Sequence, residues 1–381
     1  MKKIDDVILT NIKCLKQQEF SEAIVFVSNI KLAYKLFDKK NVVIVKSYPF
    51  INALCVLGNI HTICSLSKYN FVTYISALSN VEALVDVSKK VLNCNTLLTG
   101  KNVTIAYIDT GIRPHLDFVC GENRIIKFKD FVNQCDKPYD DNGHGTFVSG
   151  VGSGNGLISN GLYKGFAWKS NIVSVKALDN KGEASASKIL ESMQWIYDNH
   201  KVYDIKVVCM SFGSEPLGFN DPIMKGAEML WKSGITIVSA AGNSGPHAQS
   251  IKSPAVSSKI ISVGGMDDNR MDNKSLNSNF YEIADFSSRG PAFKRHKPDL
   301  VTPSVSIVSC KYKDGFYTSL SGTSVATPMV AGIIALAYEK NKNLKPDFIK
   351  KCLLASCKPI TFNRNWEGNG LLNAEKFLSF V

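Results

Sequence analysis

The sequence predicts an α/β fold with a mostly parallel sheet covered by helices on both faces, preceded by a small α+β domain. Glycine is almost absent from residues 1–95 and frequent from residue 99 onward. In the second region β-branched apolar runs alternate with helical patterns, which is typical of a parallel sheet. We therefore divide the chain into residues 1–90 and 91–381.

The first region alternates short apolar runs with stretches of helical period. Its expected strands are 23–27, 42–45, 53–57 and 71–75, and its expected helices are 31–37 and 60–69. The resulting order, β-α-β-β-α-β, is that of a ferredoxin-like sandwich.

The second region carries longer buried-type strands and amphipathic helices. Its expected strands are 103–108, 172–175, 207–210, 235–239 and 260–263, and its expected helices are 187–200 and 222–233. The second helix has clear boundaries, with Asp221 as N-cap, Pro222 at the first position and Gly234 just past the end.

Length and charge exclude several classes of protein. A chain of 381 residues is too long for a single small binding module. The longest apolar stretch, 325–338, is interrupted by Thr327 and Pro328, so we expect no membrane-spanning helix. The net charge of +12 is spread along the chain rather than gathered in one stripe, so we expect no nucleic-acid partner.

The number and spacing of the cysteines indicate the cellular compartment. The ten cysteines form no C-x-x-C pair, and residues 1–20 hold no continuous apolar leader. Free thiols in a reducing bacterial cytoplasm fit this pattern best. Leaderless export and association with spores remain open alternatives.

Three side chains of catalytic type stand at the junctions between elements. Asp109 follows the apolar run 103–108, His144 lies between two glycines, and Ser324 precedes an apolar helical pattern. Taken singly, Asp109 could be a turn residue, His144 part of a surface turn, and Ser324 a helix N-cap. Functional side chains of open α/β sheets gather at the carboxyl ends of the strands, so the combination indicates a site.

Together these residue types match nucleophilic acyl transfer. A serine hydroxyl needs an imidazole to take its proton, and the imidazole needs a carboxylate to fix its tautomer. The oxyanion that forms needs hydrogen-bond donors. Asn243, which follows the run 235–239 closely, and the backbone N–H of Ser324 could supply them.

With these residues the sequence resembles the subtilisin-like serine peptidases, or subtilases. The resemblance spans residues 100–380 and is most like the intracellular subtilases of Gram-positive spore formers. The chain order Asp, His, Ser is that of subtilisin. The motifs that carry it are Ile108-Asp109-Thr110-Gly111, Asn142-Gly143-His144-Gly145-Thr146, Ala241-Gly242-Asn243-Ser244-Gly245-Pro246, Phe286-Ser287-Ser288-Arg289-Gly290-Pro291 and Gly322-Thr323-Ser324-Val325-Ala326-Thr327-Pro328.

The resemblance implies a serine endopeptidase that acts on proteins or peptides through an acyl-enzyme. It implies that Ser324 is the nucleophile and His144 is the general base. It also implies that Asp109 orients the imidazole of His144 and that Asn243 donates a hydrogen bond to the oxyanion. Two alternatives remain open. The chain could cleave only itself, or it could bind peptides or signal on a subtilase fold without hydrolysing them.

The resemblance also implies that substrate binds as an added strand between two edge segments. The matching residues are Gly182, Glu183, Ala184, Ser211, Phe212 and Gly213. Ordinary loops are the alternative for both segments. Lys252 corresponds to the base of the primary specificity pocket, where a lysine would favour cleavage after acidic residues. The alternative is a lysine that points into solvent.

The sequence departs from the family at two positions beside the catalytic ones. The family usually has a second histidine where this chain has Phe147, and methionine where it has Val325. Neither change removes a catalytic atom, so we expect effects on rate or specificity only.

The N-terminal domain resembles the propeptide of the family, which assists folding and inhibits the enzyme from within the same chain. We expect autocatalytic cleavage of a zymogen between about residues 77 and 95, where the strand pattern is lost. A permanent N-terminal domain is the alternative.

We expect no cofactor for catalysis. Subtilases often bind structural Ca²⁺, but residues 152–165 hold no carboxylate, which leaves the neighbourhood of Asp267 and Asp268. His115 and His247 have no partner at metal-ligand spacing in the sequence, so no metal site is predicted.

Overall fold

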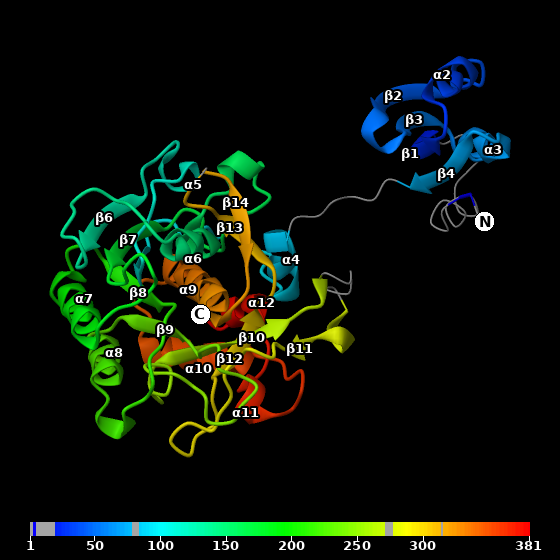
Figure 1. Cartoon of the computed structure of the whole chain (residues 1–381). Coiled ribbons are helices and arrows are strands. Elements are labelled where there is room, and N and C mark those ends of the chain that lie inside the picture. The colour runs from blue at the N-terminus through cyan, green and yellow to red at the C-terminus, as the bar shows by residue number, and fades with distance from the viewer. Residues whose placement is uncertain (1–2, 5–19, 78–83, 271–276, 314) are drawn as a thin grey trace. The chain divides into compact units, whose positions relative to one another are not determined.

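The structure is a computed structural model of the whole chain (Figure 1). It describes residues 3–4, 20–77, 84–270, 277–313 and 315–381. The chain forms two compact units, Met1–Val81 and Glu82–Val381.

The N-terminal unit has the predicted ferredoxin-like topology. Its elements, in chain order, are β1 (Phe20–Val27), α2 (Ile30–Asp38), β2 (Val43–Tyr48), η1 (Pro49–Ile51), β3 (Ala53–Asn59), α3 (Ile60–Ser65), η2 (Leu66–Lys68) and β4 (Val72–Ala77). The strands form one antiparallel sheet in the order β2-β3-β1-β4. Alternate residues of β1, with Phe37 and Ile63 of the helices, build a core that belongs to this unit.

The C-terminal unit is built on a mostly parallel sheet, as predicted. The strands are β5 (Thr104–Asp109), β6 (Ile125–Asp130), β7 (Asn171–Lys176), β8 (Ile205–Met210), β9 (Thr236–Ala240), β10 (Ile261–Asp267), β11 (Glu282–Ile283) and β12 (Leu300–Pro303). They lie in the order β11-β10-β9-β8-β5-β7-β6, with β12 beside β10. The pairings are parallel except that of β10 with β11.

Helices cover both faces of this sheet. The helix α6 (His144–Ser153) packs against α9 (Thr323–Lys340), and α9 also packs along β8, β9 and β10 (Figure 1). On the other side α7 (Ala186–Asn199) packs against α8 (Pro222–Lys232) (Figure 1). The remaining elements are α4 (Leu84–Val91), α5 (Leu116–Val119), η3 (Leu157–Ser159), η4 (Gly218–Asn220), η6 (Ser278–Phe280), α10 (Pro346–Ser356), α11 (Arg364–Glu367) and α12 (Ala374–Ser379).

The helix α9 runs through the interior of the unit. Its residues from Val325 to Tyr338 are all buried. A helix that is apolar on nearly every side is stable only when protein surrounds it, which explains the long apolar stretch in the sequence. Asp221 caps α8 by accepting from the Met224 N–H at 3.0 Å, and Pro222 is its first residue, as predicted.

Several strands of the structure were not predicted. These are β6, the short strands β11 and β12, and the antiparallel hairpin of β13 (Ile307–Cys310) with β14 (Tyr317–Leu320). Short strands carry little periodicity of their own and form because neighbouring strands offer hydrogen-bond partners.

The division between the units falls earlier than residue 90. The helix α4 belongs to the C-terminal unit, because Val87, Val91 and Leu92 pack into its core. Its amphipathic pattern is too short to show which core it joins.

None of the nine cysteines in the described part of the chain is paired in a disulfide. The described residues also contain no helix that is both long enough and apolar enough to cross a bilayer.

The buried position of α9 leads to a stability prediction. Ile333→Ala should lower the free energy of unfolding by about 2–5 kcal/mol, because it leaves a cavity in a fully buried position. Val202→Ala, at a site with 74% of its surface exposed, is the control and should change it little. Urea denaturation of the purified proteins measures both. Equal changes in the free energy of unfolding for the two variants would contradict the central position of α9.

Candidate functional site

Asp109 is the last residue of β5 and is buried at the carboxyl end of the sheet. Its Oδ1 accepts a hydrogen bond from the backbone N–H of Thr110 at 2.8 Å. The same oxygen lies 2.7 Å from Nδ1 of His144. Asp109 is thus more than a turn residue, because its carboxylate joins two elements.

His144 is the first residue of α6 and faces the end of β5. The preceding Gly143 has φ of 107°, a left-handed conformation that favours glycine. A methyl group on Gly145 would lie 2.2 Å from the carbonyl oxygen of Gly111. Glycine at both sites therefore allows the helix to begin against the Asp109 turn. The His144 side chain stays 28% exposed, so a substrate can reach it.

The surroundings of His144 set its pKa. Burial alone would lower the pKa, but the attraction and hydrogen bond of Asp109, with a smaller contribution from Asp140, raise the pKa of His144 above its usual value. The hydrogen bond to Asp109 also assigns the proton of neutral His144 to Nδ1, which leaves Nε2 free to accept a proton.

Ser324 and Asn243 meet at the start of α9. Asn243 Oδ1 accepts from the Thr323 backbone N–H and hydroxyl, both at 2.9 Å. The Asn243 Nδ2 amide is thereby left to donate elsewhere. A methyl group on Gly322 would lie 3.2 Å from both Asn243 Nδ2 and Ser324 Oγ. The amide and the hydroxyl therefore border the same small space, and the N-cap of α9 is Gly322, not Ser324.

Sequence reasoning missed a carboxylate that organises the loop before α6. Asp140 accepts hydrogen bonds from the backbone N–H of Gly143 at 2.7 Å and from the backbone and hydroxyl of Thr146 at 2.9 and 2.6 Å. It also accepts from the Thr110 hydroxyl at 2.9 Å. Asp140 thus ties the turn after β5 to the start of α6. The position of Asp140 at the start of Asp140-Asp141-Asn142-Gly143 is the feature of the sequence that could have indicated this role.

A buried lysine was also missed. The ammonium of Lys176, at the end of β7, donates to the Thr110 carbonyl at 2.6 Å, to the Leu178 carbonyl at 3.0 Å and to Asp141 at 2.7 Å. From the sequence, a lysine at the end of an apolar strand is expected at the surface. Its hydrogen-bond partners lie in neighbouring segments of the fold, so they could not be predicted from the sequence.

The two expected substrate-binding segments border one pocket. A pocket of about 520 Å³ is lined by residues from both of them, namely Gly182, Glu183, Ala184, Phe212 and Gly213. Leu178, Ile189 and Leu217 give it apolar walls. Ser211 does not line this pocket; its hydroxyl donates to the Ser324 carbonyl at 2.9 Å.

Most of the Lys252 side chain is covered by protein. Its ammonium forms an ion pair with Glu215, and only 18% of its side chain is exposed. The stem of the lysine lies against Gly213 and Gly242, where an added methyl group would come within 2.6 and 2.5 Å of its Cβ and Cγ.

Phe147 and Val325, the two departures beside the site, are both buried in the core of the C-terminal unit. Their side chains pack against other core residues.

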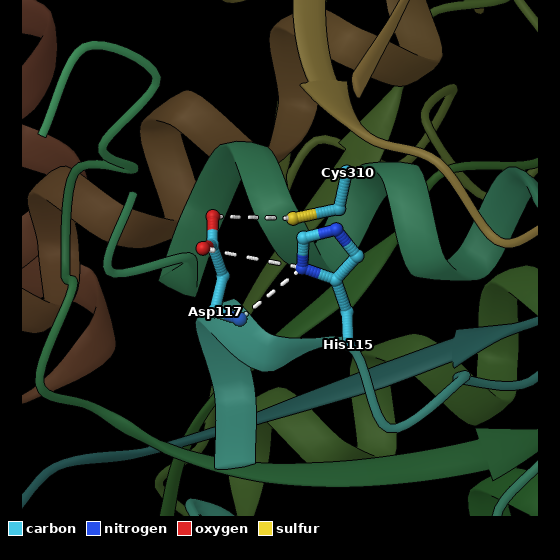
Figure 2. Close-up of side chains that lie close together, drawn as sticks. All are labelled: His115, Asp117 and Cys310. Carbon is cyan, nitrogen blue, oxygen red and sulfur yellow. Dashed lines mark hydrogen bonds and ion pairs between the residues drawn. The ribbon is translucent and has the colours of Figure 1, made fainter. Parts of the chain in front are cut away.

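A further cluster of side chains of metal-ligand type joins His115, Asp117 and Cys310 (Figure 2). Contrary to the sequence expectation, His115 has neighbours of metal-ligand type, because the fold brings Asp117 and Cys310 to it with ligand atoms within 4.8 Å of one another. Cys310 lies 195 positions after His115 in the sequence, so no spacing rule could reveal the cluster.

The chemistry of this cluster does not fit Ca²⁺, which prefers oxygen ligands. Its polar atoms also have partners in the protein. His115 Nε2 lies 3.0 Å from the Phe316 carbonyl, the Cys310 thiol donates to Asp117 at 3.7 Å, and the Tyr317 hydroxyl donates to Asp117 at 2.8 Å. Burial, together with Asp117, raises the pKa of the Cys310 thiol well above its usual range. The cluster is therefore complete as a hydrogen-bonded network.

The other position considered for calcium is occupied by protein groups. Asp268 is buried and paired with Arg270 at 2.6 Å, and Asp267 accepts from the Asn269 N–H at 2.8 Å. These two carboxylates do not form an open oxygen cage in the described part of the chain.

Comparison with known proteins identifies the family to which this arrangement is similar. The sequence model of the subtilase family, Peptidase_S8, matches residues 100–374. The chain is 39% identical to serine protease AprX of Bacillus subtilis over 77% of this chain and 72% of that protein. It is 28% identical to thermitase of Thermoactinomyces vulgaris over 74% of this chain and 90% of that protein.

Solved structures agree with these sequence matches. A psychrophilic protease, S41, superposes with a TM-score of 0.66 at 27% identity, over 77% of this chain and 99% of that one. A cold-adapted subtilisin-like serine proteinase superposes with a TM-score of 0.58 at 30% identity, over 73% of this chain and 89% of that one. The resemblance drawn from the motifs is confirmed.

The contact between Asp109 and His144 leads to a prediction about proton binding. Asp109→Asn removes the charge that raises the pKa of His144, so that pKa should fall below its value in the unchanged protein. NMR titration of the imidazole signals measures it. Asp198→Asn, at an exposed residue bonded to Gln194, is the control and should leave it unchanged. A His144 pKa that does not fall in Asp109→Asn would show that the contact does not form.

Proposed function

Because this chain belongs to the subtilase family of serine endopeptidases, we propose that it hydrolyses peptide bonds in proteins through an acyl-enzyme on Ser324. His144 acts as the general base and Asp109 orients it. The observation that carries the proposal is the 2.7 Å contact between His144 Nδ1 and Asp109 Oδ1, which leaves Nε2 as the proton acceptor.

The reaction follows from the atoms available. Ser324 Oγ attacks the carbonyl carbon of the substrate and passes its proton to His144 Nε2. The imidazolium, stabilised by Asp109, then gives that proton to the departing amine, which leaves an ester on Ser324. His144 then takes a proton from water as the water attacks the ester, and it returns that proton to Ser324 Oγ as the new carboxyl end of the substrate leaves.

Asn243 supplies the donor for the oxyanion in this proposal. Its Oδ1 is held by Thr323, so the Nδ2 amide is fixed in direction before substrate arrives. A preorganised donor costs no reorganisation when charge develops on the substrate oxygen. The N–H of Ser324, in the first turn of α9, adds a second donor at the positive helix end.

Substrate binding is assigned to the segments around the 520 Å³ pocket. A peptide would add as a strand between residues 181–184 and 211–213, with one side chain in the apolar pocket. Gly182, with φ of 80°, keeps the first segment open to a close backbone approach.

Two alternatives use the same residues differently. An enzyme that cleaves only itself would react once at Ser324 and show no turnover. A peptide-binding protein would not need an imidazole poised on a buried carboxylate, so the His144 and Asp109 pair favours hydrolysis. Turnover of casein by the purified protein distinguishes them.

We propose that the N-terminal unit is a propeptide that inhibits the peptidase until autocatalytic cleavage of the zymogen. The expected cleavage range, 77–95, includes residues 78–83, which lie outside the described residues. From residue 84 the chain forms α4, where Val87 and Val91 are packed into the core. A peptide bond within a packed helix is a poor substrate, so cleavage should fall before α4.

No metal enters the proposed mechanism. We place the enzyme in the cytoplasm, because free thiols persist where the redox environment is reducing. Fractionation of cells that carry the native gene tests the location.

The nucleophile can be tested by fluorophosphonate labelling with intact-mass analysis. The unchanged protein should gain one label and Ser324→Ala none, because the label bonds only to an activated serine hydroxyl. Ser321→Ala, three residues earlier in the same loop, is the matched control and should still label. Equal labelling of the unchanged protein and Ser324→Ala would reject Ser324.

The assignment of Asn243 as an oxyanion donor predicts a partial loss of catalytic activity when its amide is removed. Asn243→Leu should lower kcat by about 10²–10³-fold with KM nearly unchanged, because the lost donor acts in the transition state. Steady-state hydrolysis of a peptide substrate measures both constants. A loss confined to KM would contradict the role.

Processing predicts a new N-terminus. Active enzyme should begin between residues 77 and 84, and Ser324→Ala should keep residue 1. N-terminal sequencing together with intact mass decides this. An active protein that retains its full N-terminus would favour the permanent domain.

A further inference from the structure

The cluster of His115, Asp117 and Cys310 brings together three side chains of zinc-ligand type. His115 and Asp117 stand at the start of α5, and Cys310 is the last residue of β13. All three residues are buried, and Figure 2 shows their side chains pointing toward one another. An imidazole, a carboxylate and a thiolate are each common ligands of Zn²⁺.

The spacing of the ligand atoms matches the size of a zinc ion. Cys310 Sγ lies 3.7 Å from Asp117 Oδ2, and His115 Nδ1 lies 4.0 Å from Asp117 Oδ1. One ligand atom from each residue lies within 4.8 Å of the other two. Atoms spaced in this way enclose a point roughly 2.1–2.8 Å from each, and zinc bonds measure about 2.0–2.2 Å to nitrogen or oxygen and about 2.3 Å to sulfur. Small inward movements of the side chains would therefore complete the site.

Hydrogen bonds determine which nitrogen of His115 can bind a cation. The backbone N–H of Asp117 donates to Nδ1 at 3.2 Å, so Nδ1 carries no proton in neutral His115. Nε2 therefore carries the proton and donates it to the Phe316 carbonyl at 3.0 Å. Histidine ligands of metals almost always donate their second ring N–H to a carbonyl, a carboxylate or water. The fold thus supplies an unprotonated nitrogen together with the outer partner that a metal ligand requires.

Neighbouring groups hold the carboxylate and the imidazole in place. The Tyr317 hydroxyl donates to Asp117 Oδ2 at 2.8 Å, and its ring packs edge-on against the imidazole of His115, with centroids 5.8 Å apart. The buried guanidinium of Arg124 donates to the backbone carbonyl of Asp117. Its other two printed hydrogen bonds go to the carbonyls of Ser153 and Ser170, so its hydrogen bonds leave the Asp117 carboxylate available to a cation.

We propose that His115 Nδ1, the Asp117 carboxylate and Cys310 Sγ bind one zinc ion as a buried structural site. Cys310 binds as the thiolate, so one thiol proton passes to solvent for each zinc ion that is bound. The cation replaces the thiol proton and the Asp117 N–H as the link between the side chains. Water fills the fourth position of the tetrahedral ion.

The proposed site joins the two chain segments that carry residues of the catalytic site. His115 lies in the segment that follows Asp109, and Cys310 lies in the hairpin that leads into Ser324. The three ligands meet only in the folded chain, so zinc binding should stabilise the folded state and raise Tm. This inference does not depend on the proposed peptidase activity.

The experiment uses the full chain with Ser324→Ala, which prevents self-digestion. Protein freed of metal by a chelator is titrated with Co²⁺, which occupies tetrahedral zinc sites and gives a thiolate-to-cobalt charge-transfer band only when sulfur is bound. We expect the band to saturate at one Co²⁺ per chain. Zinc affinity is then measured by competition with a chromophoric chelator, and Tm is measured with and without Zn²⁺.

Variants in the same background assign the ligands. Cys310→Ser should abolish the band and the rise in Tm, and it should weaken zinc binding by more than about 100-fold, because losing only an outer partner already costs about 10–100-fold. Cys352→Ser, at another buried cysteine, is the matched control and should keep all three properties. Tyr317→Phe removes an outer partner of Asp117 but no ligand, so it should keep the band and weaken zinc binding by about 10-fold.

Two results would overturn the inference. One is the lack of a stoichiometric cobalt band in the Ser324→Ala protein, which would show that the cluster is a hydrogen-bonded network only. The other is a band and a zinc affinity that Cys310→Ser leaves unchanged, which would place the bound metal elsewhere. If Cys310→Ser does not fold, His115→Gln decides the question through the same loss of zinc affinity. All these measurements are independent of peptidase activity.

Discussion

The contact between His144 and Asp109 is the constraint on which the rest of the site depends. Asp109 ends a buried strand and His144 begins a buried helix, so their side chains can meet only if the two backbones approach closely. Gly143 and Gly145 permit that approach, and a methyl group on Gly145 would overlap the Gly111 carbonyl. The proposed catalytic contact and the backbone geometry of this segment therefore depend on the same glycines.

Polar groups that take no part in the proposed chemistry hold this contact in place. Asp140 satisfies backbone N–H groups at the start of α6, and Lys176 satisfies carbonyls of the turn after β5. Both are buried or nearly so, and a buried polar group without partners is costly. Such networks fix one arrangement because every alternative leaves partners unsatisfied. The imidazole is thereby positioned before substrate binds.

The sequence revealed the parts of this account that have local signatures. Long apolar strands, the capping of α8 by Asp221 and the glycines around His144 each leave a pattern within a few residues. The partners of Lys176 and Lys252, and the meeting of His115 with Cys310, leave none, because they join segments separated by up to 195 positions through the tertiary fold. Short strands such as β13 and the membership of α4 also depended on neighbours that periodicity cannot show.

The central claim is that Ser324, His144 and Asn243 act on one carbonyl group. A crystal structure of the enzyme treated with a peptidyl phosphonate, which forms a stable tetrahedral adduct with an activated serine, tests it most directly. The account predicts a bond from Ser324 Oγ to phosphorus, with one phosphoryl oxygen within hydrogen-bond distance of Asn243 Nδ2. An adduct on another residue, or a phosphoryl oxygen turned away from Asn243, would contradict it.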